Sequence, residues 1–450
     1  MKILSKIYVM ILLALLCRIV PVSAEPMHLP TKMPVAKAES VGMSTKGLAH
    51  IEDVMSEHIE AGHIKGGVTI VARRGKVVHF STHGEMDTTK GRAMETDAIF
   101  VMASSTKPVL GVAAMMAIEE GLISPSDPVS KYIPEFADMK VAVPLKSSNG
   151  KVAKGKGEDK AKAKAMDKAK ALAKDKTKGK SKNKVPEYLL IPVDTPVTIH
   201  HLLTHTSGLT GHGLGSKVSS VGRHTKEDTL ASYIPKLAQV PLDFQPGTQW
   251  GYSMGLDIVA RVIEIVTKTP FDKFLQERIF DPLEMNNTHF NLPGDKASQR
   301  IVLTGIGAIK GKDWLAPTKY ISASAGLSST AEDFLHFEQM LLNGGELFGH
   351  RLLIPSSVKM MGSNQTGDLF STSAKVPKGM GFGYTVSITL DSNIAADHRG
   401  SGAFGWRGAA GSVSWSDPEN ELVAVYLPAI PRGGSVYSDF EKAVYQAIID

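Results

Sequence analysis

The two ends of this 450-residue chain carry the same pattern, a pair of predicted strands beside an amphipathic helix. Near the N-terminus, residues 68–72 and 77–81 flank the polar turn Arg-Arg-Gly-Lys; near the C-terminus, residues 411–416 and 421–427 flank Asp-Pro-Glu-Asn. Both patterns are typical of β-hairpins. Apolar residues at helical spacing indicate the two helices: Leu48, Ile51, Val54, Met55 and Ile59, then Phe440, Val444, Ala447 and Ile448. We therefore expect an α+β fold, an α/β sandwich with one antiparallel sheet built from both termini, flanking helices and a mostly helical inserted region.

The first 24 residues are predicted to be a signal peptide. Lysines precede an apolar run over residues 7–16, and residues 22–24 (Val-Ser-Ala) have the small side chains of a cleavage site. The run is well short of the roughly 20 residues that a membrane span needs. Cys17, the only cysteine, lies inside the predicted signal peptide, so the mature chain would have no thiol for a disulfide. We expect an exported protein, periplasmic or secreted, with one folded domain over residues 25–450.

Residues 146–185 differ in composition from the rest of the chain. They hold fifteen lysines and four acidic residues, a local charge of +11, which leaves −5 for the remainder of a chain of net charge +6. With few large apolar residues, this segment cannot bury enough surface to offset the entropy of ordering. We expect a mostly disordered surface insertion that contacts an anionic polymer or a membrane surface. The mildly acidic remainder gives no indication of specific nucleic-acid binding.

The pattern Ser-x-x-Lys occurs four times, at Ser104/Lys107, Ser148/Lys151, Ser181/Lys184 and Ser356/Lys359. Only Ser104 follows an apolar stretch, residues 98–102, and opens a long apolar helix, in which Pro108 is tolerated because it lies in the first turn. A spacing of three puts the Ser104 and Lys107 side chains on one helix face. A lysine in such a position can act as base for a serine nucleophile, and the helix N-terminus favours an oxyanion.

Two further segments have the composition of a site. Tyr252 ends the turn-rich sequence over residues 246–252 just before an apolar helix, so it is either a buried core ring or a proton relay. Residues 404–409 (Phe-Gly-Trp-Arg-Gly-Ala) precede the C-terminal hairpin, and their glycines allow the backbone to approach a ligand.

Taken in order, these segments resemble the penicillin-recognising serine hydrolases: class C β-lactamases, DD-peptidases and family VIII carboxylesterases. The matching stretches are residues 100–108 (Phe-Val-Met-Ala-Ser-Ser-Thr-Lys-Pro), 198–209 (Thr-Ile-His-His-Leu-Leu-Thr-His-Thr-Ser-Gly-Leu), 246–253 (Pro-Gly-Thr-Gln-Trp-Gly-Tyr-Ser) and 405–408 (Gly-Trp-Arg-Gly). The resemblance covers about residues 38 to 450 and implies a β-lactamase/transpeptidase-like fold.

The resemblance also implies roles for individual residues. Ser104 would be the nucleophile, Lys107 its activator and Tyr252 the acid/base relay. The backbone N–H groups of Ser104 and Ala409 would form the oxyanion hole, with Trp406, Arg407 and Gly408 beside the substrate.

The sequence departs from the family pattern at two positions. Met254 stands where the tyrosine motif usually has an asparagine, and Trp406 stands where the strand motif usually begins with Lys or His. Strand alternation turns Arg407 to the face opposite Trp406. Since that first cation helps β-lactamases to hold the substrate carboxylate, we expect carboxylic esters as substrates. The alternatives are hydrolysis of β-lactams or D-Ala peptide amides, and a catalytically silent exported binding protein.

Three other sequence patterns partly match known catalytic or binding motifs. Residues 251–255 (Gly-Tyr-Ser-Met-Gly) match a nucleophile elbow centred on Ser253, but no convincing buried strand precedes them. His201 and His205 are spaced like a zinc pair, without the glutamate that a metalloprotease requires. Glycines at 305, 307 and 311 lack the spacing of a dinucleotide site. We expect no cofactor and no metal.

Overall fold

The computed structural model describes residues 32–145, 185–253, 255–302, 316–372, 377–429 and 435–450. The predicted signal peptide lies outside these residues, and so does the lysine-rich segment except for Val185. Among the helices of the described residues, none has both the length and the apolar character that crossing a membrane requires.

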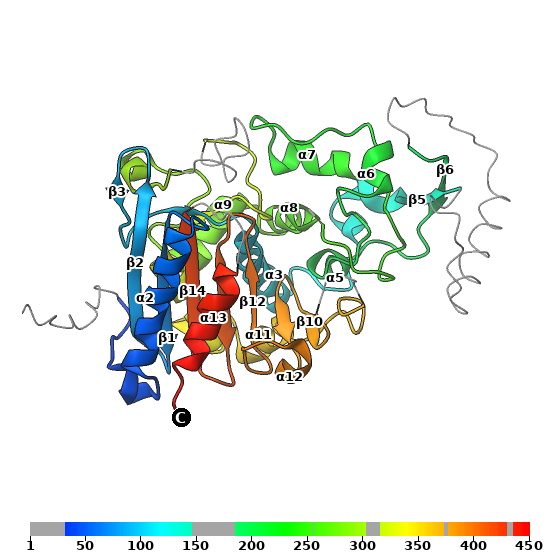
Figure 1. The fold of residues 1–450 in the computed structure, drawn as a ribbon. Coiled ribbons are helices and arrows are strands. Elements are labelled where there is room, and N and C mark those ends of the chain that lie inside the picture. Colours follow the sequence, from blue (N-terminus) through cyan, green and yellow to red (C-terminus); the bar gives the residue numbers. More distant parts are fainter. Residues whose placement is uncertain (1–31, 146–184, 254, 303–315, 373–376, 430–434) are drawn as a thin grey trace, which may run out of the picture.

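An eight-stranded antiparallel sheet joins the two ends of the chain, as the sequence predicts (Figure 1). The C-terminal strand β14 pairs with β1 from Gly66↔Ala429 to Arg73↔Leu422, so the two terminal hairpins are adjacent. In spatial order the strands are β10 (Met380–Phe382), β11 (Ser387–Thr389), β12 (Phe404–Arg407), β13 (Val413–Asp417), β14 (Leu422–Ala429), β1 (Gly66–Arg73), β2 (Lys76–Asp87) and β3 (Arg92–Ala93).

The turn between β1 and β2 has the backbone that a tight hairpin needs. Arg74 and Gly75 have φ angles of 51° and 72°. Two consecutive left-handed residues match the right-handed twist of the flanking strands. The register of the predicted N-terminal hairpin follows from this turn, with Arg73 opposite Lys76.

Helices α2 (Thr45–Glu60) and α13 (Val436–Gln446) lie side by side over one face of the sheet (Figure 1). They are the two helices predicted from apolar spacing. Ser44 caps α2 by accepting a hydrogen bond from the Gly47 N–H, and Trp415 of β13 is fully buried beneath α13. Strand alternation divides β14 between two apolar clusters: Leu422, Ala424 and Tyr426 face α2 and α13, and Val423, Val425 and Leu427 face the opposite side.

The opposite face carries the inserted helical region. Helices α10 (Ala331–Leu342) and α3 (Lys107–Glu119) belong to the apolar cluster on this side of the sheet. The region also contains α5 (Ile199–Leu203), α6 (Leu214–Val218), α7 (Leu230–Leu237), α8 (Leu256–Thr267), α9 (Phe271–Leu275), α11 (Pro355–Met361) and α12 (Ser392–Ala395). Single turns complete it: η2 (Ala103–Thr106), η3 (Val129–Lys131), η4 (Pro134–Asp138), η5 (Gln276–Phe280) and η6 (Gly294–Gln299). A further turn, η1 (Ala38–Val41), belongs instead to the apolar cluster on the α2 face.

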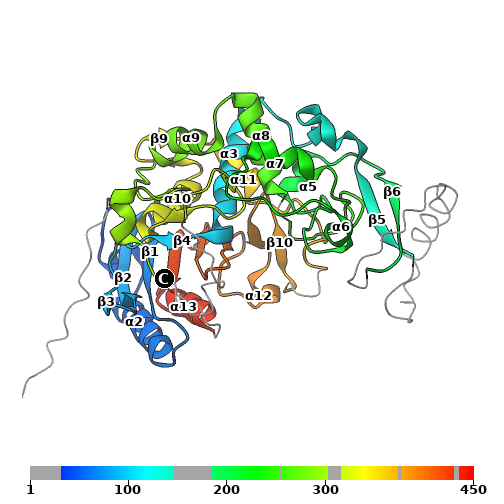
Figure 2. The same cartoon turned by 90° about the horizontal axis from the view of Figure 1, so that it is seen from above.

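Three short strand pairs interrupt the helical region. They are β4 (Phe100–Val101) with β7 (Ser328–Ser329), β5 (Lys140–Pro144) with β6 (Tyr188–Pro192), and β8 (Glu346–Leu347) with β9 (His350–Arg351). The β5–β6 pair lies at the end of the molecule remote from α2 (Figure 1 and Figure 2). Its strands continue to Leu145, whose N–H donates to Glu187 O at 2.7 Å. The lysine-rich segment therefore leaves and re-enters the fold at one hairpin tip.

Candidate active site

Ser104 lies in a sharp turn between β4 and α3. The residue before it, Ala103, is buried with a φ of 45°. Ser104 belongs to the 3₁₀ turn η2, which leads directly into α3, so the α-helix begins at Lys107 and not at Ser104 as predicted. Left-handed backbone at a non-glycine residue costs free energy and persists only where the surroundings fix it. Here Met102 N–H donates to Leu327 O at 2.9 Å and Ser412 Oγ donates to Met102 O at 2.9 Å.

The Ser104 hydroxyl lies within hydrogen-bond distance of the two side chains predicted to transfer its proton. Lys107 Nζ lies 3.1 Å from Ser104 Oγ, and Tyr252 OH lies 2.7 Å from the same atom. Lys107 Nζ is also 4.8 Å from the centre of the Tyr252 ring. Lys107 is 2% exposed, whereas Ser104 and Tyr252 are only half-buried. The three groups therefore form one cluster that is open on the serine side.

Lys107 has a second hydrogen bond that fixes its position from behind. Its Nζ donates to the backbone carbonyl of Ser324 at 2.6 Å. The Ser324 N–H donates in turn to Asp257 Oδ1 at 2.8 Å, and Tyr320 OH donates to Asp257 Oδ2 at 2.8 Å. Asp257 thus holds the segment whose carbonyl orients Lys107.

Both burial and the charge of Lys107 shift the pKa values of ionisable groups around this cluster. Burial raises the pKa of Asp257, although hydrogen bonds from Ser324 and Tyr320 and the charge of Lys107 oppose it. Burial, reinforced by the charge of Lys107, lowers the pKa of His205 well below its usual value. His205 is therefore a neutral ring at pH 7, and it packs 4.8 Å from the Tyr252 ring, centre to centre.

Strand β12 places Trp406 and Arg407 on opposite faces, as strand alternation predicts. The Trp406 indole stacks on Tyr252 at 5.9 Å with an interplanar angle of 26°, and its N–H has no hydrogen-bond partner in the described part of the chain. The Arg407 guanidinium instead lies over the Tyr437 ring of α13, at 5.9 Å. The face of β12 toward Tyr252 therefore presents an indole and not a cation.

The turn after β12 approaches the Ser104 turn closely at Gly408. A Cβ on Gly408 would come within 2.2 Å of Met102 O, so a side chain there would push the two segments apart. Gly408 N–H donates to Ser412 O at 2.7 Å, and Ala409 follows as an exposed residue. Pairing of the Ala409 and Ser104 N–H groups around an oxyanion stays a prediction.

The alternative sites proposed from the sequence have structural roles in the fold. Ser253 is 1% exposed; its Oγ lies 3.2 Å from His205 Nδ1 and accepts from the Gly255 N–H, so it faces inward. His201 Nδ1 accepts from the Thr198 N–H in the cap of α5, and burial, with the charge of His200, lowers its pKa to about 4. The dinucleotide alternative at residues 305–311 lies outside the described residues.

Sequence reasoning missed Asp257, Ser324 and an aromatic wall next to Tyr252. A charged residue that opens the apolar run of α8 is the signal that could have pointed to Asp257. The wall consists of rings with centres 4.9–5.6 Å apart, from Trp250, Phe370, Phe382 and Trp406. Trp250 and Trp406 lie in the matching motifs, but Phe370 and Phe382 lie outside them, so no local pattern shows that the four rings meet.

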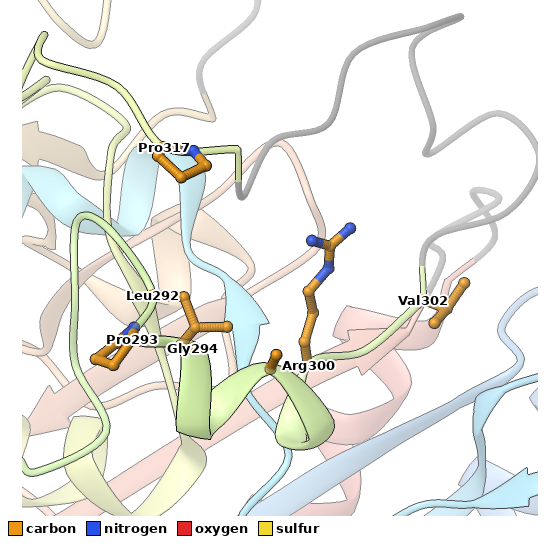
Figure 3. Close-up of a pocket in the computed structure, with 7 residues that line it drawn as sticks. Leu292, Pro293, Gly294, Arg300, Val302 and Pro317 are labelled. Atoms are coloured by element: carbon orange, nitrogen blue, oxygen red, sulfur yellow. The ribbon is translucent and has the colours of Figure 1, made fainter.

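A separate hollow of about 340 Å³ lies beside η6 (Figure 3). Figure 3 shows the Arg300 side chain standing between Leu292 and Val302. Its lining contains none of Ser104, Lys107 and Tyr252. The hollow is therefore separate from the predicted active site at Ser104.

Comparison with known proteins agrees with the resemblance of the motifs. The Beta-lactamase family model matches residues 51–151 and 169–442. "Protein Rv1367c" of Mycobacterium tuberculosis is 29% identical over 387 residues, 82% of this chain and 87% of its own. "Esterase EstB" of Burkholderia gladioli is 25% identical over 397 residues, 82% of this chain and 86% of its own.

Solved structures share the fold. "EstCE1, a hydrolase with promiscuous acyltransferase activity" superposes with a TM-score of 0.68 at 22% identity, covering 89% of this chain and 99% of its own. With the family model matching most of its length, this chain belongs to the Beta-lactamase family of serine hydrolases.

Proposed function

We propose that this protein is a carboxylesterase that forms an acyl-enzyme on Ser104. The observation that carries the proposal is the convergence of Lys107 Nζ, at 3.1 Å, and Tyr252 OH, at 2.7 Å, on one half-buried serine hydroxyl. A nucleophile, a base and a second proton-transfer group within hydrogen-bond reach are what nucleophilic acyl transfer requires.

Acylation then proceeds as follows. Lys107, as the amine, accepts the Ser104 proton while Oγ attacks the ester carbonyl carbon. The tetrahedral oxyanion is held by the N–H groups of Ser104 and Ala409. As the C–O bond breaks, Tyr252 donates its proton to the leaving alkoxide and recovers one from Lys107, whose ring contact at 4.8 Å keeps the two groups together. Water repeats the steps on the acyl-enzyme, releasing the acid.

The surroundings of Tyr252 favour an ester over a β-lactam. Trp406 stacks on Tyr252, while Arg407 is turned to Tyr437 on the opposite face, so β12 offers no cation for a substrate carboxylate. Losing a charge-assisted hydrogen bond costs roughly 1.5–3 kcal/mol, about ten- to a hundredfold in rate when the bond is made in the transition state. A neutral ester is indifferent to this loss. The relative EstB, which is named as an esterase, supports the same choice.

The nucleophile is tested by labelling with a fluorophosphonate probe and mapping the modified peptide. We expect one adduct, on Ser104, and its loss in Ser104→Ala together with turnover. Ser253→Ala is the matched control, since Ser253 is buried two residues from Gly255 and we expect it to leave labelling intact. An adduct on Ser253, or full turnover in Ser104→Ala, contradicts the assignment.

The substrate class is tested by kcat/KM for p-nitrophenyl butyrate and for nitrocefin on one preparation. We expect the ester to be turned over much faster, and Trp406→Lys to narrow the difference. A nitrocefin value equal to or above that of the ester would instead make the enzyme a β-lactamase, with Ser104, Lys107 and Tyr252 in the same roles.

A further inference from the structure

One polar cluster lies in the otherwise apolar layer between α2 and the sheet. Leu48, Ile51, Val54 and Met55 of α2 belong to this apolar layer. Into the same layer project Thr69 of β1, fully buried, and His79 and His83 of β2, each 5% exposed. Polar groups in such a layer cost free energy unless they are partnered. The partners of these three residues therefore decide what the cluster is for.

The two histidines converge on one point. Both Nε2 atoms lie 2.7 Å from Thr69 Oγ1. Residues four apart on a strand begin roughly 13 Å from each other. The two rings therefore lean toward each other above Ser81, which is the residue paired with Thr69.

Glu52 of α2 closes the cluster from the other side. Its Oε2 lies 3.2 Å from His83 Nδ1, and one ligand atom from each of Glu52, His79 and His83 lies within 4.8 Å of the others. Burial opposes ionisation of Glu52, but His83, Ser81 and His79 lower its pKa to about 2. Because its side chain is 42% exposed, this ionised carboxylate also gives an ion a path from solvent.

We propose that Glu52, His79 and His83 bind one divalent transition-metal ion, with Zn²⁺ as the best match. Zinc, cobalt and nickel bind well to a set of two imidazoles and one carboxylate. Calcium and magnesium prefer sets made of oxygen ligands alone. Metal binding needs deprotonated ligands, and the ionised Glu52 supplies one at neutral pH.

Thr69 acts as a supporting group for the ion. When His83 Nε2–H donates to Thr69 Oγ1, its Nδ1 lone pair faces Glu52 and the metal, which is the tautomer a ligand needs. Without the ion, Nδ1–H donates to Glu52 and Thr69 donates to Nε2. Binding thus changes the tautomer of His83, and Thr69 Oγ1 becomes the acceptor of the His83 Nε2–H.

The distances set what must move on binding. Zinc bonds of about 2.0–2.2 Å place ligand atoms roughly 3.3 Å apart. The separation of 3.2 Å between Glu52 and His83 already fits. The widest ligand separation, at most 4.8 Å, has to shrink by up to about 1.5 Å, which side-chain rotation of His79 can supply. The bound ion would tie α2 to the first hairpin.

The thermal midpoint of unfolding tests the site. After chelation and dialysis, ZnCl₂ should raise the Tm of the full chain by a few degrees once it exceeds the dissociation constant, and MgCl₂ should not. We expect Glu52→Gln and His83→Ala to abolish the rise. His50→Ala is the matched control: His50 also lies on α2, but it is exposed and its Nδ1 faces Asp53 Oδ2 at 3.5 Å. It should keep the rise.

Visible absorption of bound Co²⁺ is a second measurement, and on the unmodified protein it does not depend on the folding of any variant. The unmodified protein should bind one equivalent and show the intense bands of a low-symmetry site, and Glu52→Gln should lose them. A Tm that does not respond to zinc, or a response that persists in Glu52→Gln, would overturn the proposal and leave a hydrogen-bonded Glu52–His83–Thr69–His79 chain.

Discussion

The two faces of the eight-stranded sheet each bury a polar network, and the networks differ in what they leave open. On the α3 side, Lys107 is held by the Ser324 carbonyl and points at the half-buried Ser104 hydroxyl. On the α2 side, Thr69 is held between two histidines and is fully buried. Both contain a hydroxyl beside a nitrogen base. Only the first exposes its hydroxyl to a substrate, so access and not the set of residue types separates a reactive serine from a structural threonine.

Removing Asp257 should have the largest effect, because Asp257 positions Lys107 through Ser324 without contacting Ser104 itself. Asp257→Ala frees the Ser324 N–H and so the carbonyl that orients Lys107, and misplacing a catalytic group by about 1 Å costs up to roughly a hundredfold in rate. We expect kcat on a small ester to fall about ten- to a hundredfold, with KM nearly unchanged.

Two variants sharpen that result. Asp257→Asn keeps an acceptor for the Ser324 N–H and should recover part of the lost kcat. Asp333→Asn is the control, because Asp333 is an equally buried carboxylate that accepts from Asn287 N–H and Thr288 Oγ1, both at 2.8 Å, without reaching Lys107. If it lowers kcat as much as Asp257→Asn, the effect is general loosening of the fold.

The α2 network should respond in stability and not in rate. Thr69→Val has nearly the same shape but leaves two buried imidazole nitrogens without their common partner, which costs roughly 1–3 kcal/mol. Denaturant unfolding in metal-free buffer should show this loss while kcat stays unchanged. A loss of kcat with unchanged stability would mean that the two faces of the sheet are coupled.

The sequence predicts those residues of each network that lie close together along the chain, and not those that are far apart. Ser104 and Lys107 are three residues apart in sequence, and Tyr252 stands in a recognisable motif, so local patterns are enough to predict these three residues. The hydrogen bond from Lys107 to Ser324 joins residues 217 apart, and that from Ser324 to Asp257 joins residues 67 apart. Glu52 and His83 come together only because α2 packs on β2. No local pattern encodes such contacts.

The terminal hairpins were predictable for a related reason. Their strands are adjacent in sequence, and the turn residues Arg74 and Gly75 specify the pairing. The order of the whole sheet required one further step, the pairing of β14 with β1. The similar strand and helix patterns at the two ends of the chain suggest that their strands share one sheet. Hydrophobic patterning alone does not determine which strand edges pair.

Two carboxylates, one on each face of the sheet, should make stability depend on pH in opposite directions. One should limit stability as pH rises, and the other as pH falls. Burial raises the pKa of Glu338, which accepts from Ser414 and Ser416, to about 7, whereas the pKa of Glu52 is lowered to about 2. A folded pKa above the unfolded value means that stability falls as pH rises from about 4.5 through 7. A lowered pKa means that stability falls as pH drops below about 4.5 toward 2.

We therefore expect Glu338→Gln to flatten the decline between pH 5 and 8, by on the order of 1–2 kcal/mol. Glu52→Gln should instead flatten the loss of stability below about pH 4.5, because the stability that the ionised Glu52 contributes at neutral pH is then absent throughout. The free energy of unfolding measured from about pH 2 to 8 gives both results. A Glu338→Gln variant with the same alkaline slope as the unmodified protein would show that other groups set that slope.

The lysine-rich segment should affect the chemistry least of all. Its flanks pair as a hairpin, with Pro144 opposite Tyr188 and the Leu145 N–H bonded to Glu187 O, at the end of the molecule remote from α2. Replacing residues 146–186 by a two-residue Asn-Gly turn therefore closes β5 onto β6 without moving either strand. We expect kcat/KM on a soluble ester to change less than twofold.

Adsorption to anionic vesicles or polymers should respond differently to the same deletion. The removed segment has a net charge of +11, whereas the rest of the chain has a net charge of −5, and attraction between exposed charges weakens as salt rises. Salt-sensitive adsorption should therefore disappear in the deletion variant, while a variant with the segment's lysines replaced by glutamine should lose adsorption equally and keep the length. Unfolding on deletion would show that the segment packs on the domain. Adsorption that survives both changes would place the anionic contact elsewhere on the surface.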